Sequence, residues 1–119
     1  MRVYVWKERF AIAKARRPID GFAVIKDRNE ITVILEESKL DHEDIIEANK
    51  GWRILTFDAV LPFGLVGFLA KISTALAEEG ISIFVISSYS TDHILIKDEH
   101  LSKAIKKLES LGFEVSFER

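Results

Sequence analysis

A short turn near the middle of the chain joins two glycines to the start of an apolar helical pattern. The turn is Phe63-Gly64-Leu65-Val66-Gly67, and it follows a strand-like sequence over residues 52–60. A tight turn at a helix start leaves backbone N–H groups without intrahelical partners, and the positive pole of the helix dipole lies at the same end. The turn is therefore predicted to hold a carboxylate or a phosphate. An ordinary turn between a strand and a helix is the alternative.

A polar segment further along the chain supplies a carboxylate that could bind a cationic group, whereas the glycine turn is expected to bind an anionic one. Its residues are Ser88, Tyr89, Ser90, Thr91 and Asp92, and they should fold back toward the glycine turn. The carboxylate of Asp92, or that of Asp58 near the end of the strand entering the glycine turn, can pair with an ammonium or guanidinium group. Either aspartate also fits a turn role in which it bonds nearby backbone. Tyr89 either stacks on a ligand or lies half-buried at an edge. Backbone donors beside a carboxylate indicate a zwitterionic ligand.

Residue types that carry catalysis or bind metals do not form a recognisable site. The chain has no cysteine, no G-x-S-x-G sequence, no Walker loop and no G-x-G-x-x-G sequence. The serines before Thr91 have only His93 nearby, which does not make a catalytic triad. His42, His93 and His100 lack the spacing of metal ligands. We therefore expect no catalytic residue, no metal and no cofactor, and we predict a binding module rather than an enzyme.

Length and composition predict one compact domain or two small halves that share a core. The chain has 119 residues, of which 48% are hydrophobic, so disorder is not expected. No run of about 18 apolar residues is present, and the first residues do not resemble a signal peptide. Together with the absence of cysteine, these features predict a cytoplasmic protein without a membrane partner.

The first 28 residues are basic, with eight Lys and Arg against three Asp and Glu. A basic segment can bind a phosphate-rich partner such as a nucleic acid. A solvated face beside an acidic neighbour is the more ordinary explanation. The strands lack the aromatic pattern of an RNA-binding sheet, so nucleic acid is kept only as an alternative partner.

The second half of the chain has the pattern of a β-α-β-β-α-β unit. The expected elements are strands over 52–60, 81–88, 93–97 and 113–117, and helices over 65–79 and 98–111. Gly80 and Gly112 lie at the two helix exits, and Asp98 is expected to cap the second helix. The fold class is therefore α+β, with a ferredoxin-like unit over residues 51–119 that has both helices on one sheet face.

The first half, residues 1–50, is predicted to be smaller and rich in β-structure. Strands are expected over residues 3–6, 9–13, 22–26 and 31–35, and Asp27-Arg28-Asn29-Glu30 is typical of a hairpin turn. Residues 41–49 are expected to form a short helix that ends at Gly51, because acidic residues follow an aspartate that can act as an N-cap.

The segment from residue 56 to residue 97 resembles the ACT domain, the amino-acid-sensing module of metabolic regulators. The matching sequences are Phe63-Gly64-Leu65-Val66-Gly67, Glu79-Gly80-Ile81-Ser82-Ile83 and Ile86-Ser87-Ser88-Tyr89-Ser90-Thr91-Asp92. The resemblance is closest to the branch that contains the arginine sensor CASTOR and the regulatory end of aspartokinases. It extends well over residues 52–115 and only loosely over the first fifty residues.

This resemblance implies a regulatory module that binds a free amino acid at an interface between ACT units. The α-carboxylate is expected on the backbone N–H groups of residues 64–67, and the ammonium on Asp58 or Asp92. The segment from Ser88 to Thr91, with Tyr89, is expected to shape the side-chain pocket. Because the family branch pairs two units, the first half is expected to be a degenerate second unit. An assembly subunit with a vestigial pocket is a further alternative.

One strand-like sequence indicates a partner. Ile83-Phe84-Val85-Ile86 is apolar at every position, so both faces of this strand should be buried. Two helices can cover only one face of the sheet. The other face must meet the first half of the chain or a second chain, and we predict a homodimer or a higher homo-oligomer.

Overall fold

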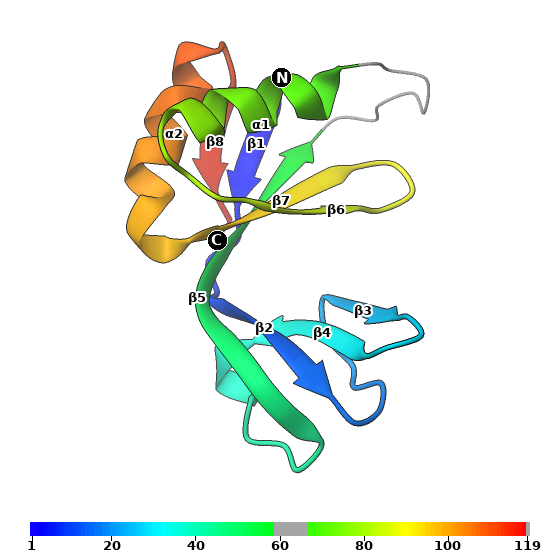
Figure 1. The fold of residues 1–119 in the computed structure, drawn as a ribbon. Coiled ribbons are helices and arrows are strands. Elements are labelled where there is room, and N and C mark those ends of the chain that lie inside the picture. Colours follow the sequence, from blue (N-terminus) through cyan, green and yellow to red (C-terminus); the bar gives the residue numbers. More distant parts are fainter. Residues whose placement is uncertain (59–66, 119) are drawn as a thin grey trace. The chain divides into compact units, whose positions relative to one another are not determined.

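The computed structural model describes residues 1–58 and 67–118, which fall into two compact units (Figure 1). The helical unit comprises Met1–Lys7 and Arg53–Arg119, and the sheet unit comprises Glu8–Trp52. The first seven residues therefore group with the second half of the chain. One strand, β5 (Ile45–Asp58), runs from the sheet unit into the helical unit.

The helical unit has the expected α+β, ferredoxin-like plan with one additional strand. After β5 come α1 (Phe68–Glu78), β6 (Phe84–Ser87), β7 (Asp92–Lys97), a 3-10 turn η2 (Asp98–His100), α2 (Leu101–Ser110) and β8 (Glu114–Phe117). The strand order is β6-β7-β5-β1-β8. The additional strand is β1 (Arg2–Val5), which is antiparallel to β5 and parallel to β8. The βαββαβ prediction is confirmed, and the place of β1 within this sheet was not predicted.

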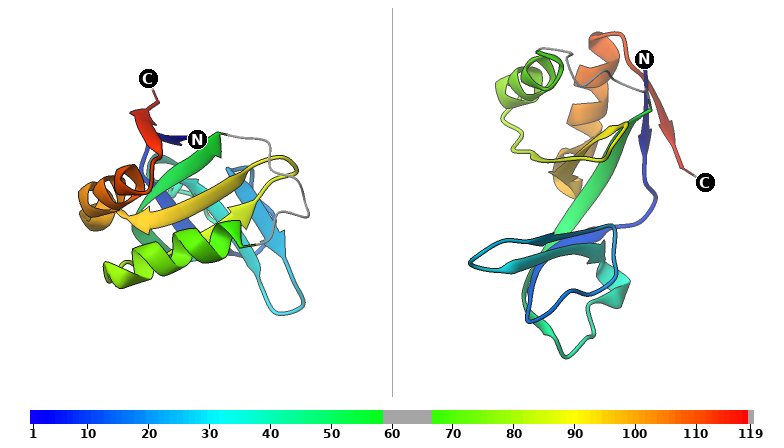
Figure 2. Two further views of the ribbon diagram at one scale, coloured as in Figure 1. Left: turned by 90° about the horizontal axis from the view of Figure 1, so that it is seen from above. Right: turned by 90° about the vertical axis from the view of Figure 1, so that its right-hand side faces the viewer.

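Both helices lie on one face of this sheet (Figure 2). Strand residues that alternate toward the helices form a core with α1 and α2, as the period-two pattern of strands requires. The fully buried members on the strands are Val3, Val5, Leu55, Phe57, Ile94 and Ile96. The predicted apolar stripe of α2 packs on them through Leu101, Ala104, Ile105, Leu108 and Leu111. The opposite face of the sheet contains a different set of side chains, among them Tyr4, Trp6, Thr56 and His93.

The prediction that Asp98 caps the second helix is wrong. Asp98 lies in η2, and the N-cap of α2 is His100, which makes no side-chain capping bond. The carboxylate of Asp98 instead accepts a hydrogen bond from Nη1 of Arg53 at 2.9 Å. Arg53 also donates through Nη2 to the backbone oxygen of Trp6 at 3.1 Å. A largely buried guanidinium competes for the carboxylate more strongly than backbone N–H groups do.

The sheet unit consists of strands and irregular connections. Its elements are β2 (Phe10–Ala15), β3 (Ala23–Lys26), β4 (Ile31–Glu36), a 3-10 turn η1 (Glu37–Lys39) and the first part of β5. The strand order is β3-β4-β2-β5, and all neighbours are antiparallel. The hairpin predicted at residues 27–30 is confirmed: Oδ1 of Asp27 accepts from the backbone N–H groups of Asn29 and Glu30 at 2.8 and 2.9 Å.

The short helix predicted over residues 41–49 is wrong. From Ile45 onward the chain is the strand β5, paired with β2, and Gly51 lies inside it with φ of 84°. A nine-residue helix is marginal by itself, whereas pairing with β2 satisfies the backbone and buries Ile45 against the core of the unit. The acidic sequence near Asp41 therefore belongs to a connection and not to a first helical turn.

The two units share one strand order. Without β1, the sheet of the helical unit has the order β6-β7-β5-β8, and the sheet unit has the order β3-β4-β2-β5. If the strands of each unit are numbered 1 to 4 along the chain, both orders are 2-3-1-4. The connections that carry α1 and α2 in the helical unit correspond in the sheet unit to residues 16–22 and 37–44, where the structure has η1 as its single helical turn. The correspondence is one of strand order alone, and a degenerate ACT-like first half stays a prediction. Within residues 1–58 and 67–118, neither α-helix is long and apolar enough to cross a bilayer.

Candidate functional site

The start of α1 has the features of an anion site in the part that the structure describes. Its N-cap is Gly67, which adopts a left-handed conformation with φ of 85° and has no side chain to bond the first N–H groups. The first turn contains no acidic residue, and it ends at the exposed Lys71. The positive pole of the helix is therefore not neutralised by a local carboxylate. The other expected residues of the glycine turn, Phe63, Gly64, Leu65 and Val66, lie outside the described residues.

The polar segment forms the turn between β6 and β7, hereafter the ligand turn, Ser88–Thr91. The turn closes through the backbone N–H of Ser88, which donates to the oxygen of Thr91 at 2.8 Å. The hydroxyl of Ser88 lies 3.1 Å from the same oxygen and 2.7 Å from Oγ1 of Thr91. Tyr89 and Ser90 occupy the tip, and the side chain of Tyr89 is among the most exposed at 84%. The alternative of a half-buried Tyr89 is therefore wrong for this structure.

The two candidate aspartates lie on opposite faces of the sheet. Asp92 begins β7 and alternates with Ile94 and Ile96, whose side chains face the helices. It is half-buried, and its Oδ1 accepts from the hydroxyl of Ser87 at 2.5 Å. Asp58 ends β5 and alternates with Thr56 on the other face, where it is exposed. The face that contains Asp92 is the face on which α1 packs.

Thr56, Trp6 and His93 form a buried polar chain that ends at the ligand turn. The indole Nε1 of Trp6 donates to Oγ1 of Thr56 at 2.8 Å, and Oγ1 of Thr56 lies 2.8 Å from Nδ1 of His93. Nε2 of His93 lies 3.0 Å from the hydroxyl of Ser88. Burial lowers the pKa of His93, and the nearby charge of Asp92 partly opposes this effect.

Sequence reasoning missed this chain because its members come from three segments that lie far apart in the sequence. The pattern of residue types presents His93 only as a possible metal ligand or triad member. One local signal was available. His93 is a polar residue within an otherwise apolar strand sequence, directly after a segment of hydroxyl residues, and a buried histidine needs hydrogen-bond partners.

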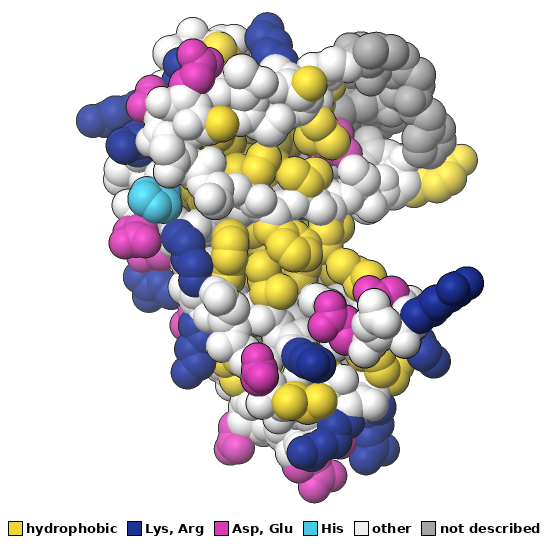
Figure 3. Space-filling model, viewed as in Figure 1, with side chains coloured by type: hydrophobic (Ala, Val, Ile, Leu, Met, Phe, Trp, Pro, Cys, Tyr) yellow, Lys and Arg dark blue, Asp and Glu magenta, His cyan; other side chains and the backbone are white. Residues whose placement is uncertain are grey.

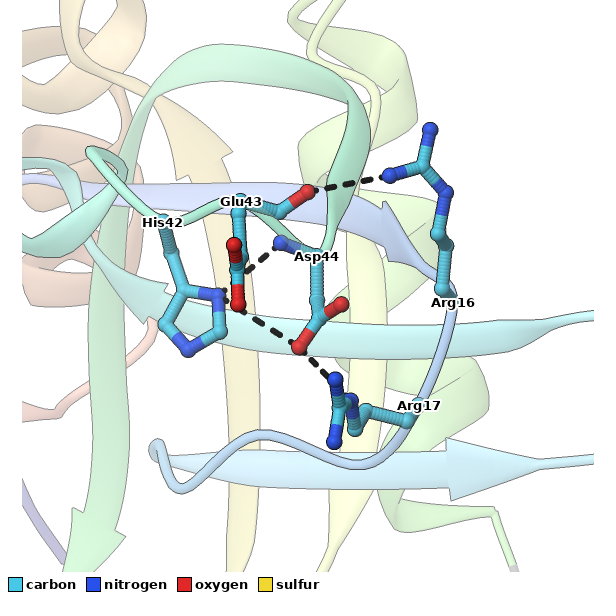
Figure 4. A network of polar contacts seen from close by, with 5 residues as sticks. All are labelled: Arg16, Arg17, His42, Glu43 and Asp44. Carbon is cyan, nitrogen blue, oxygen red and sulfur yellow. Dashed lines mark hydrogen bonds and ion pairs between the residues drawn. The ribbon is translucent and has the colours of Figure 1, made fainter.

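A second polar cluster ties the two irregular connections of the sheet unit together (Figure 4). Oδ2 of Asp44, which is buried, accepts from Nε of Arg17 at 2.7 Å. The backbone N–H of Arg16 donates to the oxygen of Asp44 at 2.8 Å, and Nη1 of Arg16 donates to the oxygen of Glu43 at 3.1 Å. The backbone N–H of Asp44 donates to Nδ1 of His42 at 3.0 Å. These contacts replace the helix packing that covers the corresponding face of the helical unit.

The basic first segment does not form one cationic surface within a unit. Arg2 and Lys7 belong to the helical unit and the other six cations to the sheet unit, where Arg16 and Arg17 take part in the cluster just described. On the face that Figure 3 shows, the described Lys and Arg side chains are interspersed with Asp and Glu. The structure thus offers no specific support for the phosphate-rich partner. Among the described residues no group of three or more potential ligands is placed to hold a metal ion.

A model of the ACT domain family matches residues 47–110, more than half of the chain. The search of curated proteins found no match. Among solved structures, the chain is similar to the protein Atu0741 of Agobacterium tumefaciens, with 22% identity, 99% of this chain and 93% of the other covered, and a TM-score of 0.85.

Two further solved structures share the fold. The protein VC0802 of Vibrio cholerae, described as a possible transport protein, has 22% identity and a TM-score of 0.78, with 89% of this chain and 85% of the other covered. The regulatory subunit of aspartate kinase from Thermus thermophilus, in a ligand-free form, has 12% identity and a TM-score of 0.67, with 92% and 96% covered. At these identities the similarity shows the fold alone.

Proposed function

Because the chain belongs to the ACT domain family, we propose that it is a non-enzymatic regulatory module that binds a free amino acid. The helical unit contains the site, with the carboxylate at the start of α1 and the ammonium on Asp92. The observation that carries this proposal is that α1, whose start at Gly67 has no neutralising acid, packs on the face of the sheet that also contains the carboxylate of Asp92. A zwitterion needs both kinds of group within a few ångströms.

Asp92 is a better partner for the ammonium than Asp58. The hydrogen bond from Ser87 fixes the orientation of the Asp92 carboxylate, and a carboxylate has capacity for several donors, so a ligand ammonium can still be accepted. Asp58 is exposed and alternates onto the opposite face, away from the helices. In water-exposed positions an ion pair contributes little. The site is therefore proposed to consist of residues 63–67, Ser88–Thr91 and Asp92.

A second copy of the chain is proposed to close the site. A tyrosine as exposed as Tyr89 shapes a ligand pocket only when another surface covers its ring. The strand β6 pairs with β7 and, among the described residues, with no second strand. Residues 81–91 contain no charged side chain, and charges are the common protection of an edge strand. We propose that β6 of two chains pair edge to edge, so that the amino acid lies between ACT units of two copies.

Amino-acid binding is tested by a thermal-shift screen of the twenty amino acids, since a ligand that binds the native state raises the melting temperature. A rise with one or a few amino acids is expected. No rise with any of them at millimolar concentration would contradict amino-acid binding. The absence of cysteine supports a cytoplasmic location for such a sensor.

The site assignment is tested by two matched variants. We expect Asp92→Asn to lose about 1.5–3 kcal/mol of binding free energy, because a shielded charge-assisted bond is lost, with a stability loss of only about 1 kcal/mol. Asp58→Asn should bind as the wild type does. Calorimetric titration with the amino acid found in the screen measures both. If only Asp58→Asn loses affinity, the ammonium is on the other face and the assignment is wrong.

The dimer is tested by placing a charge on each of two edge strands. Val85 on β6 and Val24 on β3 are partly exposed, at 39% and 43%, so a lysine is tolerated at either position. Val85→Lys should convert the dimer to a monomer of 13.6 kDa in light scattering, whereas Val24→Lys should remain dimeric. A monomeric wild type at micromolar concentration, or a dimer unaffected by Val85→Lys, would contradict pairing through β6.

A further inference from the structure

The surface of α1 that faces away from the sheet has few charges for an exposed helix face. The helix packs into the core through Phe68, Ile72 and Leu76. Two of its eleven residues are charged, whereas α2 has four charged residues among ten. Charges are depleted at the cores of interfaces, and small side chains let two helices approach closely. The exposed residues of this face are Ala70, Lys71, Thr74, Ala77 and Glu78.

A groove between α1 and α2 borders this face. It has a volume of about 380 Å³, and its lining is mostly apolar. Residues 70–78 form the α1 wall, with both Lys71 and Glu78 on it, and Lys107 and Leu111 form the α2 wall. The ion pairs among the described residues include neither Lys71 nor Glu78. These two lie seven residues apart, about 10.5 Å along the helix axis, so they cannot pair within one chain.

We propose that this face of α1 packs antiparallel against α1 of a second copy of the chain, about a twofold axis between Thr74 and Ala75. The axis lies midway between Lys71 and Glu78 in the sequence. Because it is perpendicular to the helix and lies in the plane of the contact, it reverses the helix direction and leaves the groove on the same side. Lys71 of each copy therefore meets Glu78 of the partner subunit. A parallel pair would instead place each lysine level with the other lysine.

The contact through α1 is separate from the pairing proposed through β6, and it does not rest on the proposed function. An α1 of 11 residues is about 16 Å long. Interfaces of standard size reach micromolar or tighter affinity, so a contact between two helices this short is expected to be weaker. Two copies joined through β6 in one antiparallel sheet have their helices on the same face. Two α1 pairs can then form together, and we expect dimers that associate to tetramers as the concentration rises.

The first test exchanges the charges. Sedimentation equilibrium up to about 1 mM measures the association. Lys71→Glu and Glu78→Lys should each weaken the step through α1 by about tenfold or more, because both ion pairs are replaced by like charges. The double variant Lys71→Glu/Glu78→Lys should restore it to within about threefold. Lys106→Glu and Glu109→Lys, at exposed positions of α2, make the same changes in net charge and should have no effect. A double variant as weak as the single variants would overturn the antiparallel arrangement.

The second test locates the contact. In ¹H–¹⁵N spectra of labelled Val85→Lys, in which the contact through β6 is blocked, amide signals of residues 70–78 and of Leu111 should move with concentration. Thr74→Arg, which places a large side chain at the twofold axis, should abolish this movement. Movement elsewhere, or none up to about 1 mM, would overturn the proposal. The absence of movement is also the result expected of a face that binds a different protein.

The two proposed contacts fail in different ways. A wild type that is monomeric at micromolar concentration, with α1 signals that still move at higher concentration, would contradict the pairing through β6 and support the contact through α1. A dimer that Val85→Lys disrupts, with α1 signals that do not move, would contradict the contact through α1 alone.

Discussion

The helical unit and the sheet unit place their strands in the same order but cover them differently. In the helical unit two helices pack on a face of large side chains, such as Leu55 and Phe57. In the sheet unit the corresponding face contains Ala11, Ala13 and Ala15 besides Val33 and Leu35, and two irregular connections lie over it. The three alanines of β2 let backbone approach the sheet closely, so less space is left for a helix to fill. The comparison shows that strand order is maintained by pairing, whereas the covering layer depends on the size of the strand residues.

The two covering layers are also held by different forces. Leu108 and Ile72 join the helices to the sheet by burial of apolar surface. The connections of the sheet unit contribute fewer apolar residues, Ile19 and Leu40, and are joined by the cluster around Asp44. Hydrogen bonds to charged groups are directional and allow little rearrangement. The helical layer should therefore be sensitive to lost volume, and the sheet unit to lost polar partners.

The largest effect is expected from deleting one buried leucine in each unit. Leu108→Ala should reduce the free energy of unfolding by about 3–4 kcal/mol, because the helix cannot collapse into the cavity. Leu35→Ala should cost about 2 kcal/mol, because few apolar residues of the connections, Ile19 and Leu40, pack over this face and fewer contacts are lost. Leu108 and Leu35 are both fully buried, so the two substitutions remove the same side chain from equally buried positions. Urea unfolding followed by circular dichroism measures both, and an equal or larger loss for Leu35→Ala would contradict the difference.

A smaller effect is expected at Gly21, where a connection touches the sheet. A Cβ at this position lies 2.6 Å from the backbone oxygen of Ile34, closer than contact allows. Gly21→Ala should cost about 2 kcal/mol by overpacking. Gly51→Ala is the control: its added Cβ meets nothing within 4 Å, and only the positive φ opposes it, at about 1 kcal/mol. Thermal unfolding of the two variants should rank them in this order. The reverse order would show that the connection over residues 16–22 moves away from the sheet to accommodate the added methyl group.

The cluster around Asp44 is predicted to contribute about 1–2 kcal/mol. Asp44→Asn removes the charge that pairs with Arg17 while keeping the shape, and Arg17 is exposed enough to be resolvated, so the loss stays moderate. Asp41→Asn, an exposed aspartate in the same connection, should change stability by less than about 0.5 kcal/mol. Amide exchange over residues 16–22 distinguishes the two. Equal protection in both variants would show that the cluster does not hold the connections.

The smallest effect is expected at the β3–β4 turn. Two backbone N–H groups lower the pKa of Asp27, so its contribution is present above the ordinary pKa of an aspartate and is lost as the pH falls through the lowered value. Asp27→Ala should speed amide exchange at Asn29 and Glu30 without a measurable change in the melting temperature. Unchanged exchange at both amides would mean that β4 alone orders the turn.

Local patterns predicted the elements of the helical unit well and its assembly only in part. The apolar residues from Leu101 to Leu111 recur at a helical period that does not fit the alternation of a strand. Asp27 can accept hydrogen bonds from backbone N–H groups just after it, which favours a turn. The sequence from Ile45 to Asn49 fits a helix and a strand alike, and pairing with β2 decided between them. The position of β1 and the contact of Trp6 with Thr56 and His93 depend on partners far along the chain, which no local pattern encodes.

The strand β1 makes the helical unit discontinuous in the sequence, with the sheet unit inserted after its first strand. During synthesis the sheet unit is complete once the first part of β5 has emerged, because all its strand pairings lie within residues 10–52. The helical unit must wait, since β1 pairs in parallel with β8. Its first strand therefore has no final partner on that side until the last one is made, and long-range closure of this kind is slow. Folding of the proposed sensing unit should therefore follow that of the sheet unit.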